Sequence, residues 1–120
     1  MKFIETKTHA FLDYSVGILL IVSPWLFGFY ENGIESWIPI FLGASAIFYS
    51  LFTNYEWSLK RVILFRTHLV LDILSGILLA ISPWLFQFED LVFWPHLIIG
   101  LMEIVVAVFS KGDAMVDSKA

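Results

Sequence analysis

The chain has 120 residues, a length that suits one domain. Hydrophobic residues make up 59 % of it, charged residues make up 15 %, and the mean hydropathy is +0.84. A soluble domain of this size cannot bury so much apolar surface, so the composition excludes a soluble fold and predicts contact with the lipid bilayer. The net charge of -4, without a basic stripe, excludes nucleic-acid binding, and the absence of cysteine excludes disulfides and thiolate metal sites.

Four apolar segments follow one another along the chain. They cover residues 8–28, 37–54, 67–87 and 94–110. At about 17–21 residues, each is long enough to cross the hydrocarbon as a helix. The first segment follows two lysines, but no small-residue cleavage site comes after it, so we expect a retained helix and not a signal peptide. The expected fold class is all-α, a four-helix transmembrane bundle.

One pattern of 23 residues occurs twice. Residues 7–29 and 66–88 align without a gap at a spacing of 59, and 14 of the 23 paired positions are identical. The second and fourth segments correspond more weakly, through two tryptophans and two glycines. This predicts two parallel hairpin repeats, residues 1–59 and 60–120, related by an axis along the membrane normal. The first and third helices are then expected to face each other across that axis.

All basic residues flank one side of the expected membrane. They are Lys2, Lys7, Lys60, Arg61, Arg66, Lys111 and Lys119. The two opposite loops carry only acidic groups, at Glu31, Glu35, Glu89 and Asp90. The positive-inside rule therefore predicts that both termini are cytoplasmic. Aromatic residues are expected at both boundaries: Trp25, Trp37, Trp84 and Trp94 on the outer side, and Tyr55 and Trp57 on the inner side.

A Ser-Pro-Trp tripeptide stands near the end of each repeated pattern, at residues 23–25 and 82–84. The proline removes a helical donor, which frees the carbonyls of Leu20 and Leu79. We expect the serine either to leave helical geometry or to donate its hydroxyl to the preceding turn. The helix is expected to kink or break there, with the tryptophan anchored at the headgroups. The residues of the two motifs are Ser23, Pro24, Trp25, Ser82, Pro83 and Trp84.

Through these two tripeptides the chain resembles the SPW-repeat family of small bacterial integral membrane proteins, over nearly its whole length. The resemblance implies two membrane helices per repeat and a location in the bacterial inner membrane. It implies no activity and supplies no catalytic residues.

Two His–Asp pairs open the first and third helices. His9 and Asp13 are four residues apart, as are His68 and Asp72, so each pair shares one helix face. If the faces meet, they can bind a divalent transition metal such as zinc, pass protons, or clamp a haem iron between the imidazoles. The alternative is structural: a neighbouring threonine caps each helix, a basic residue (Lys7 or Arg66) neutralises each carboxylate, and the histidines lock the helix pair.

Glu103 is predicted to lie in the middle of the fourth helix, where its counterpart in the second helix is Ala46. It is either a carboxylate that binds a proton or cation, or a neutral acid bonded to a neighbouring hydroxyl. The candidate hydroxyls belong to Ser45, Ser75 and Tyr14. His96 is expected to face the headgroups.

No phosphate loop, nucleophile triad or soluble catalytic domain is visible in the sequence, so we expect no enzyme activity and no cofactor. The predicted function is that of a structural or accessory membrane protein, which packs with itself or joins a larger complex. The alternative is a small ion, proton or metal carrier, or a haem-binding protein. Such a protein would use His9, Asp13, His68, Asp72 and Glu103.

Overall fold

A computed structural model describes residues 4–53, 55–56 and 58–110. Four α-helices occupy these residues: α1 (Thr6–Leu26), α2 (Ile34–Leu51), α3 (Phe65–Leu85) and α4 (Trp94–Val108). Three of them, α1, α2 and α3, are long and apolar enough to cross a membrane, whereas α4 has 15 residues. The prediction of an all-α bundle is confirmed, and each helix boundary lies within three residues of its expected place.

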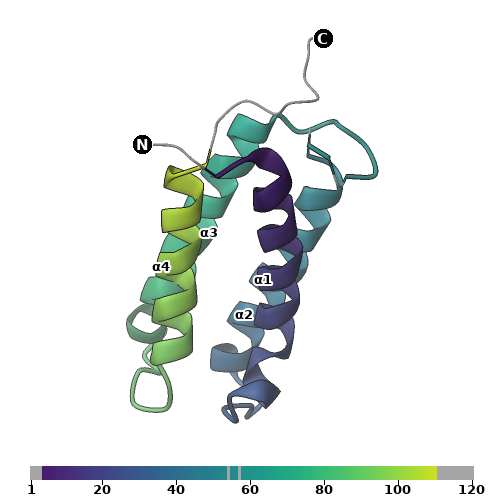
Figure 1. Cartoon of the computed structure of the whole chain (residues 1–120). Coiled ribbons are helices and arrows are strands. Elements are labelled where there is room, and N and C mark those ends of the chain that lie inside the picture. The colour runs from purple at the N-terminus through teal and green to yellow at the C-terminus, as the bar shows by residue number, and fades with distance from the viewer. Residues whose placement is uncertain (1–3, 54, 57, 111–120) are drawn as a thin grey trace.

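The helices form two antiparallel hairpins that lie side by side (Figure 1). α1 packs along α2, α3 packs along α4, and α2 also contacts α3. The starts of α1 and α3 and the ends of α2 and α4 lie together at one end of the bundle. Short backbone pairings join them there, between Ile4 and Ser110 and between Thr53 and Ile63.

Glycines allow the two helices of each hairpin to approach closely. A Cβ atom on Gly43 would lie 2.6 Å from the carbonyl oxygen of Gly17, and one on Gly100 would lie 2.6 Å from that of Gly76. Small residues at such crossings let the two backbones pack closely. Close packing favours helix association in lipid, where the hydrophobic effect does not drive helices together. The same arrangement therefore stabilises α1 against α2 and α3 against α4.

The serine of each Ser-Pro-Trp motif compensates for its proline. Ser23 donates its hydroxyl to the carbonyl of Leu20 over 2.8 Å, and Ser82 donates to Leu79 over 2.7 Å. These are the carbonyls that lose their helical donor, since each stands four residues before the proline. Both serines are buried. The expected donation to the preceding turn is confirmed, and it satisfies a carbonyl that lipid cannot solvate.

The sequence led us to expect a kink or a break at the prolines, and the expectation of a break was wrong. Instead α1 continues to Leu26 and α3 to Leu85, two residues after each proline. The chain then turns through a left-handed residue, Gly28 with φ 73° and Gln87 with φ 62°. A residue in this conformation is a common helix terminator, and it ends each helix one turn later than a break at proline would.

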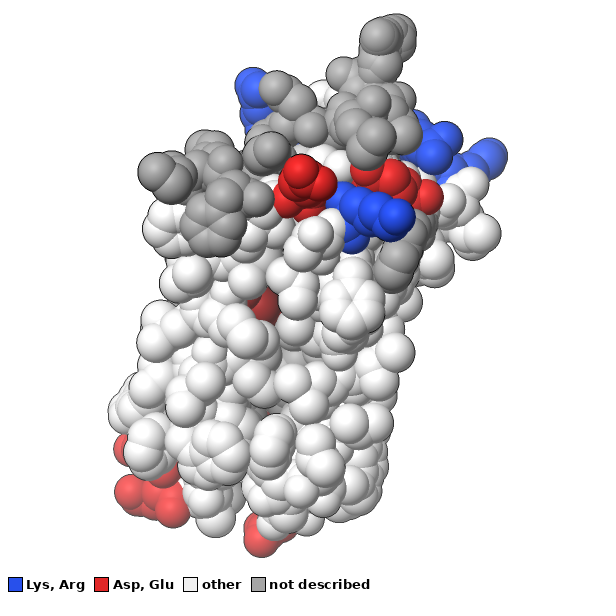
Figure 2. Space-filling view, in the orientation of Figure 1, with Lys and Arg blue, Asp and Glu red and all other residues white. Residues whose placement is uncertain are grey.

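The described basic residues gather at one end of the bundle, which we call the basic end (Figure 2). They are Lys7, Lys60, Arg61 and Arg66. The loops at the opposite end carry Glu31, Glu89 and Asp90, whereas Glu35, expected in a loop, is buried in the first turn of α2. Between the two ends the visible surface is almost free of charge. Other residues used in the topology prediction, Lys2, Trp57, Lys111 and Lys119, lie outside the described residues, as does Asn54 at the predicted end of the second helix.

Large apolar side chains point outward along the length of the bundle. Among the most exposed are Phe41 at 67 %, Phe48 at 66 %, Ile18 at 58 % and Leu74 at 58 %. Trp25, Trp37, Trp84 and Trp94 are also exposed, near the ends of their helices that adjoin the acidic loops. An apolar band bordered by tryptophan is the surface that a bilayer requires.

Candidate functional site

Two histidines and two aspartates meet between α1 and α3 near the basic end. The Nε2 atom of His9 lies 2.8 Å from Asp72 Oδ2 and 3.1 Å from Asp13 Oδ1. The Nε2 atom of His68 lies 2.8 Å from Asp13 Oδ2 and 3.2 Å from Asp72 Oδ2. Both imidazoles are fully buried, and the aspartate side chains are 10 % and 9 % exposed. We call these four residues the His/Asp cluster.

The outer nitrogen of each imidazole contacts a hydroxyl. His9 Nδ1 lies 2.6 Å from the hydroxyl of Ser110, which donates to the carbonyl of Val106. His68 Nδ1 lies 2.7 Å from the hydroxyl of Thr53, which donates to the carbonyl of Tyr49. A hydroxyl has one proton, and here the carbonyl receives it. Each imidazole therefore donates from Nδ1, and its Nε2 faces the carboxylates.

Two tyrosines bind the carboxylates from outside the cluster. Tyr49 donates to Asp72 Oδ1 over 2.6 Å, and Tyr55 donates to Asp13 Oδ2 over 2.9 Å. Burial, together with the nearby Asp13 carboxylate, raises the pKa of Tyr55 well above its usual value, so the hydroxyl keeps the proton that it donates. Tyr55 is fully buried here. The prediction that it belongs to an inner aromatic belt was wrong, because its hydroxyl has a polar partner inside the bundle.

The structure joins four of the five residues that the sequence singled out, and it joins them across the two helices. Each carboxylate contacts the histidine of its own helix and that of the other. Sequence reasoning missed the second layer of Tyr49, Thr53, Tyr55 and Ser110. The sequence offered a clue for two of these residues. Thr53 and Ser110 are 57 residues apart, the spacing that also separates the crossing glycines of α2 and α4, so they occupy equivalent positions after the two helices.

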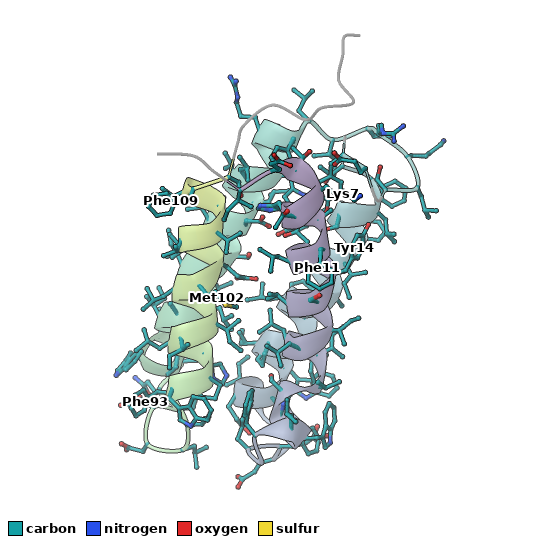
Figure 3. All side chains as sticks on the ribbon, viewed as in Figure 1. Lys7, Phe11, Tyr14, Phe93, Met102 and Phe109 are labelled. Carbon is teal, nitrogen blue, oxygen red and sulfur yellow. The ribbon has the colours of Figure 1, made fainter. Side chains whose placement is uncertain are left out.

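Glu103 lies outside the cluster but beside it. Its Oε1 atom is buried and has no hydrogen bond to any described residue. One of the three candidate hydroxyls, that of Ser75, donates instead to the backbone carbonyl of Asp72 over 3.2 Å. Glu103, Ala46 and Met102 line a cavity of about 40 Å³, to which both aspartates also contribute. Met102 extends from α4 toward α1 (Figure 3), and an acidic side chain is visible in a recess of the apolar surface in Figure 2.

Two further predictions for polar residues were wrong. His96 does not face the headgroups: it is 1 % exposed, and its Nε2 donates to the backbone carbonyl of Glu35 over 2.8 Å. α1 and α3 begin at Thr6 and Phe65, before the threonines that precede the cluster histidines, and neither helix has a side-chain cap. In α3 the first residue, Phe65, packs against both buried imidazoles.

The chemistry of the cluster suits a small cation or protons. Two imidazole nitrogens and two carboxylates are ligands that zinc and similar ions accept. Ligand atoms of all four residues lie within 4.8 Å of one another. A porphyrin does not fit between the imidazoles in this arrangement, since their ring centres are 5.4 Å apart and the carboxylates stand between the Nε2 atoms.

The chain thus combines a buried polar cluster between two apolar helical hairpins with a Ser-Pro-Trp motif near the end of the first helix of each hairpin. The family model described as "SPW repeat domain" matches residues 7–110 of the chain. The chain belongs to the SPW repeat domain family. No curated protein and no solved structure matches the chain. The family match, with the apolar helices, identifies an SPW repeat membrane protein.

Proposed function

We propose that this SPW repeat protein is a structural or accessory component of a bacterial inner membrane. In the proposed topology it crosses the bilayer four times, with the basic end in the cytoplasm. α4 is short, but it packs along α3, which has the length of a full span. The positions of Lys7, Lys60, Arg61 and Arg66 at one end support the orientation.

The observation that carries the structural role is that the His/Asp cluster links the two hairpins. Its shortest contacts, His9 to Asp72 and His68 to Asp13, both run between α1 and α3. Polar contacts of this kind hold transmembrane helices together where the hydrophobic effect does not. The exposed apolar faces then remain available for lipid, for a second copy of the chain or for a larger membrane complex.

A small ion or proton carrier is the alternative function. It draws on the three carboxylates around one cavity, those of Asp13, Asp72 and Glu103. At about 40 Å³ this cavity has room for a few water molecules, which is a binding space and not a path across the membrane. The structural role therefore accounts for more of the site. A measurement of ion or proton flux into vesicles that contain the purified protein distinguishes the carrier function from the structural role.

Removing one aspartate tests the structural role. Asp13→Ala removes the acceptor of the Tyr55 hydroxyl, and Asp72→Ala removes that of Tyr49. Each change also takes away one of the two carboxylates that contact both imidazoles, and the loss of a buried partner typically costs about 1–3 kcal/mol or more. Each variant, purified in detergent with chelator present, is expected to melt well below the parent protein. Glu31→Ala, in an exposed loop at the other end, is the control and should melt like the parent. If both aspartate variants melt like the parent, the cluster does not hold the hairpins together.

A further inference from the structure

One ligand atom from each residue of the His/Asp cluster lies within 4.8 Å of the other three, and a second layer of side chains orients the four residues. Ser110 and Thr53 accept from the Nδ1 atoms of His9 and His68, which turns both Nε2 lone pairs or protons inward. Metal-bound histidines are oriented in this way, by a hydrogen bond from the other ring nitrogen. Two independent helices thus present preorganised imidazoles to one centre.

The carboxylates are oriented by the same kind of second layer. Tyr49 binds the Oδ1 atom of Asp72, which leaves Oδ2 directed at both imidazoles. Tyr55 binds Asp13, whose two oxygens lie near one imidazole each. Carboxylates that ligate a metal are in turn hydrogen-bonded by the protein, and that support is needed for affinity.

Hydrogen bonds within the cluster do not satisfy it completely. His68 Nε2 is fully buried and lies 2.8 Å from Asp13 Oδ2, yet the geometry there is not that of a hydrogen bond, and no described residue offers it a better partner. Only His9 Nε2 makes a well-formed bond, to Asp72 Oδ2. A cation between the four groups would engage both nitrogens and both carboxylates at once, which a proton on each nitrogen does not.

Charge and ligand type identify the class of ion. Two carboxylates carry two negative charges, which one divalent cation neutralises in apolar surroundings. Imidazole nitrogen favours zinc and neighbouring transition metals over magnesium and calcium, which prefer six or more oxygens. Four protein ligands without an open position are typical of a structural zinc site.

We propose that His9, Asp13, His68 and Asp72 bind one divalent transition-metal ion of the zinc class, through both Nε2 atoms and one oxygen of each aspartate. The ion joins α1 to α3, so this proposal rests on the structural role proposed above for the His/Asp cluster. Tyr49, Thr53, Tyr55 and Ser110 are positioning residues that orient the ligands.

Cobalt(II) is the probe for this site, because its visible spectrum reports nitrogen and oxygen ligands in four-coordinate geometry. Untagged full-length protein in detergent, stripped with chelator, is titrated with Co²⁺ and then with Zn²⁺. We expect saturation at one Co²⁺ per chain, loss of the spectrum with one equivalent of Zn²⁺, and a higher melting temperature with either ion. Mg²⁺ should produce none of these effects.

Three variants assign the site to these residues. Asp72→Asn and His68→Gln keep the size of the side chain but remove a ligand, so the Co²⁺ spectrum should be lost. Thr53→Val leaves all four ligands in place and is expected to weaken affinity about 10–100-fold. Glu103→Gln removes a buried carboxylate from the adjoining cavity and should bind Co²⁺ like the parent.

Circular dichroism and gel filtration establish that each variant is folded before its titration. If a ligand variant fails to fold, Thr53→Val decides the question, since its effect on affinity is specific to an oriented His68. A folded parent protein that binds no Co²⁺ overturns the proposal. So does Co²⁺ binding that Asp72→Asn and His68→Gln leave unchanged, because the ion would then be held elsewhere.

Discussion

The serine hydroxyl of the Ser-Pro-Trp motif should contribute to the free energy of unfolding only when a proline follows the serine. In α3, Ser82 donates to the carbonyl of Leu79 over 2.7 Å, and Pro83 has no N–H to give to that carbonyl. Ser82→Ala therefore strands a buried carbonyl among apolar side chains. Leaving a buried acceptor without a donor costs about 1–3 kcal/mol, and we expect the variant to lose that much free energy of unfolding.

Pro83→Ala restores the missing donor, because the backbone N–H of an alanine at this position reaches the carbonyl of Leu79 in a regular helix. In that background, Ser82→Ala should cost less than about 1 kcal/mol. Pro83 is itself buried, so its removal also changes the packing. That cost enters both halves of a double-mutant cycle and cancels, which leaves a coupling of about 1–2 kcal/mol between serine and proline.

The four proteins of the cycle are compared by unfolding in mixed micelles of sodium dodecyl sulfate. Ser75→Ala is the matched control: Ser75 also donates to the carbonyl three residues earlier, that of Asp72, but the next residue is Gly76, which has an N–H for that carbonyl. We expect little change there. If Ser82→Ala costs the same with proline and with alanine at position 83, the serine does not serve to satisfy the freed carbonyl.

Three further predictions concern topology, helix crossing and helix termination. Because the chain has no cysteine, single cysteines at Asn32 and Lys60 can be labelled in intact cells, and only the first should react from outside; labelling of both would refute the threading. Gly100→Ala meets the backbone of the facing helix at 2.6 Å and should destabilise by about 1–3 kcal/mol, whereas Gly17→Ala meets a movable isoleucine and should cost less; equal melting would contradict this. Gln87→Gly should stabilise by about 1 kcal/mol, since φ is 62° there, and unchanged melting would count against strain at that turn.

Helices and their ends were the part of the fold that sequence could predict. Hydropathy and length indicate a membrane helix directly, and all eight helix boundaries were predicted to within three residues. The positions of the paired motifs also predicted that His9, Asp13, His68 and Asp72 belong together, because residues four apart on a helix share a face. The duplication led us to expect that α1 and α3 face each other, but which carboxylate contacts which imidazole depends on the packing, which no local pattern specifies.

The rest of the site depends on how the chain returns to the bundle. Tyr55 follows the end of α2, where an aromatic residue usually faces the membrane boundary, yet the turn after α2 carries it inward to Asp13. His96 similarly follows a proline at the start of α4, and its buried ring donates to the carbonyl of Glu35 in another helix. A partner that is distant in sequence determines both positions, so neither could be derived from its neighbours.

The structural role and the metal site share one physical requirement, which is electrical neutrality inside an apolar bundle. With neutral imidazoles, Asp13 and Asp72 would bring two uncompensated charges into the bundle, and each buried charge costs several kcal/mol. Two protons on the imidazoles or one divalent cation between them would both remove that cost. The hydroxyls of Thr53 and Ser110 hold a proton on each Nδ1 in either state, so the states differ only at the Nε2 atoms of the histidines. It follows that a chelator should lower the stability of the metal-bound protein and leave that of the protein with protonated imidazoles unchanged. The same four side chains join the hairpins in both states.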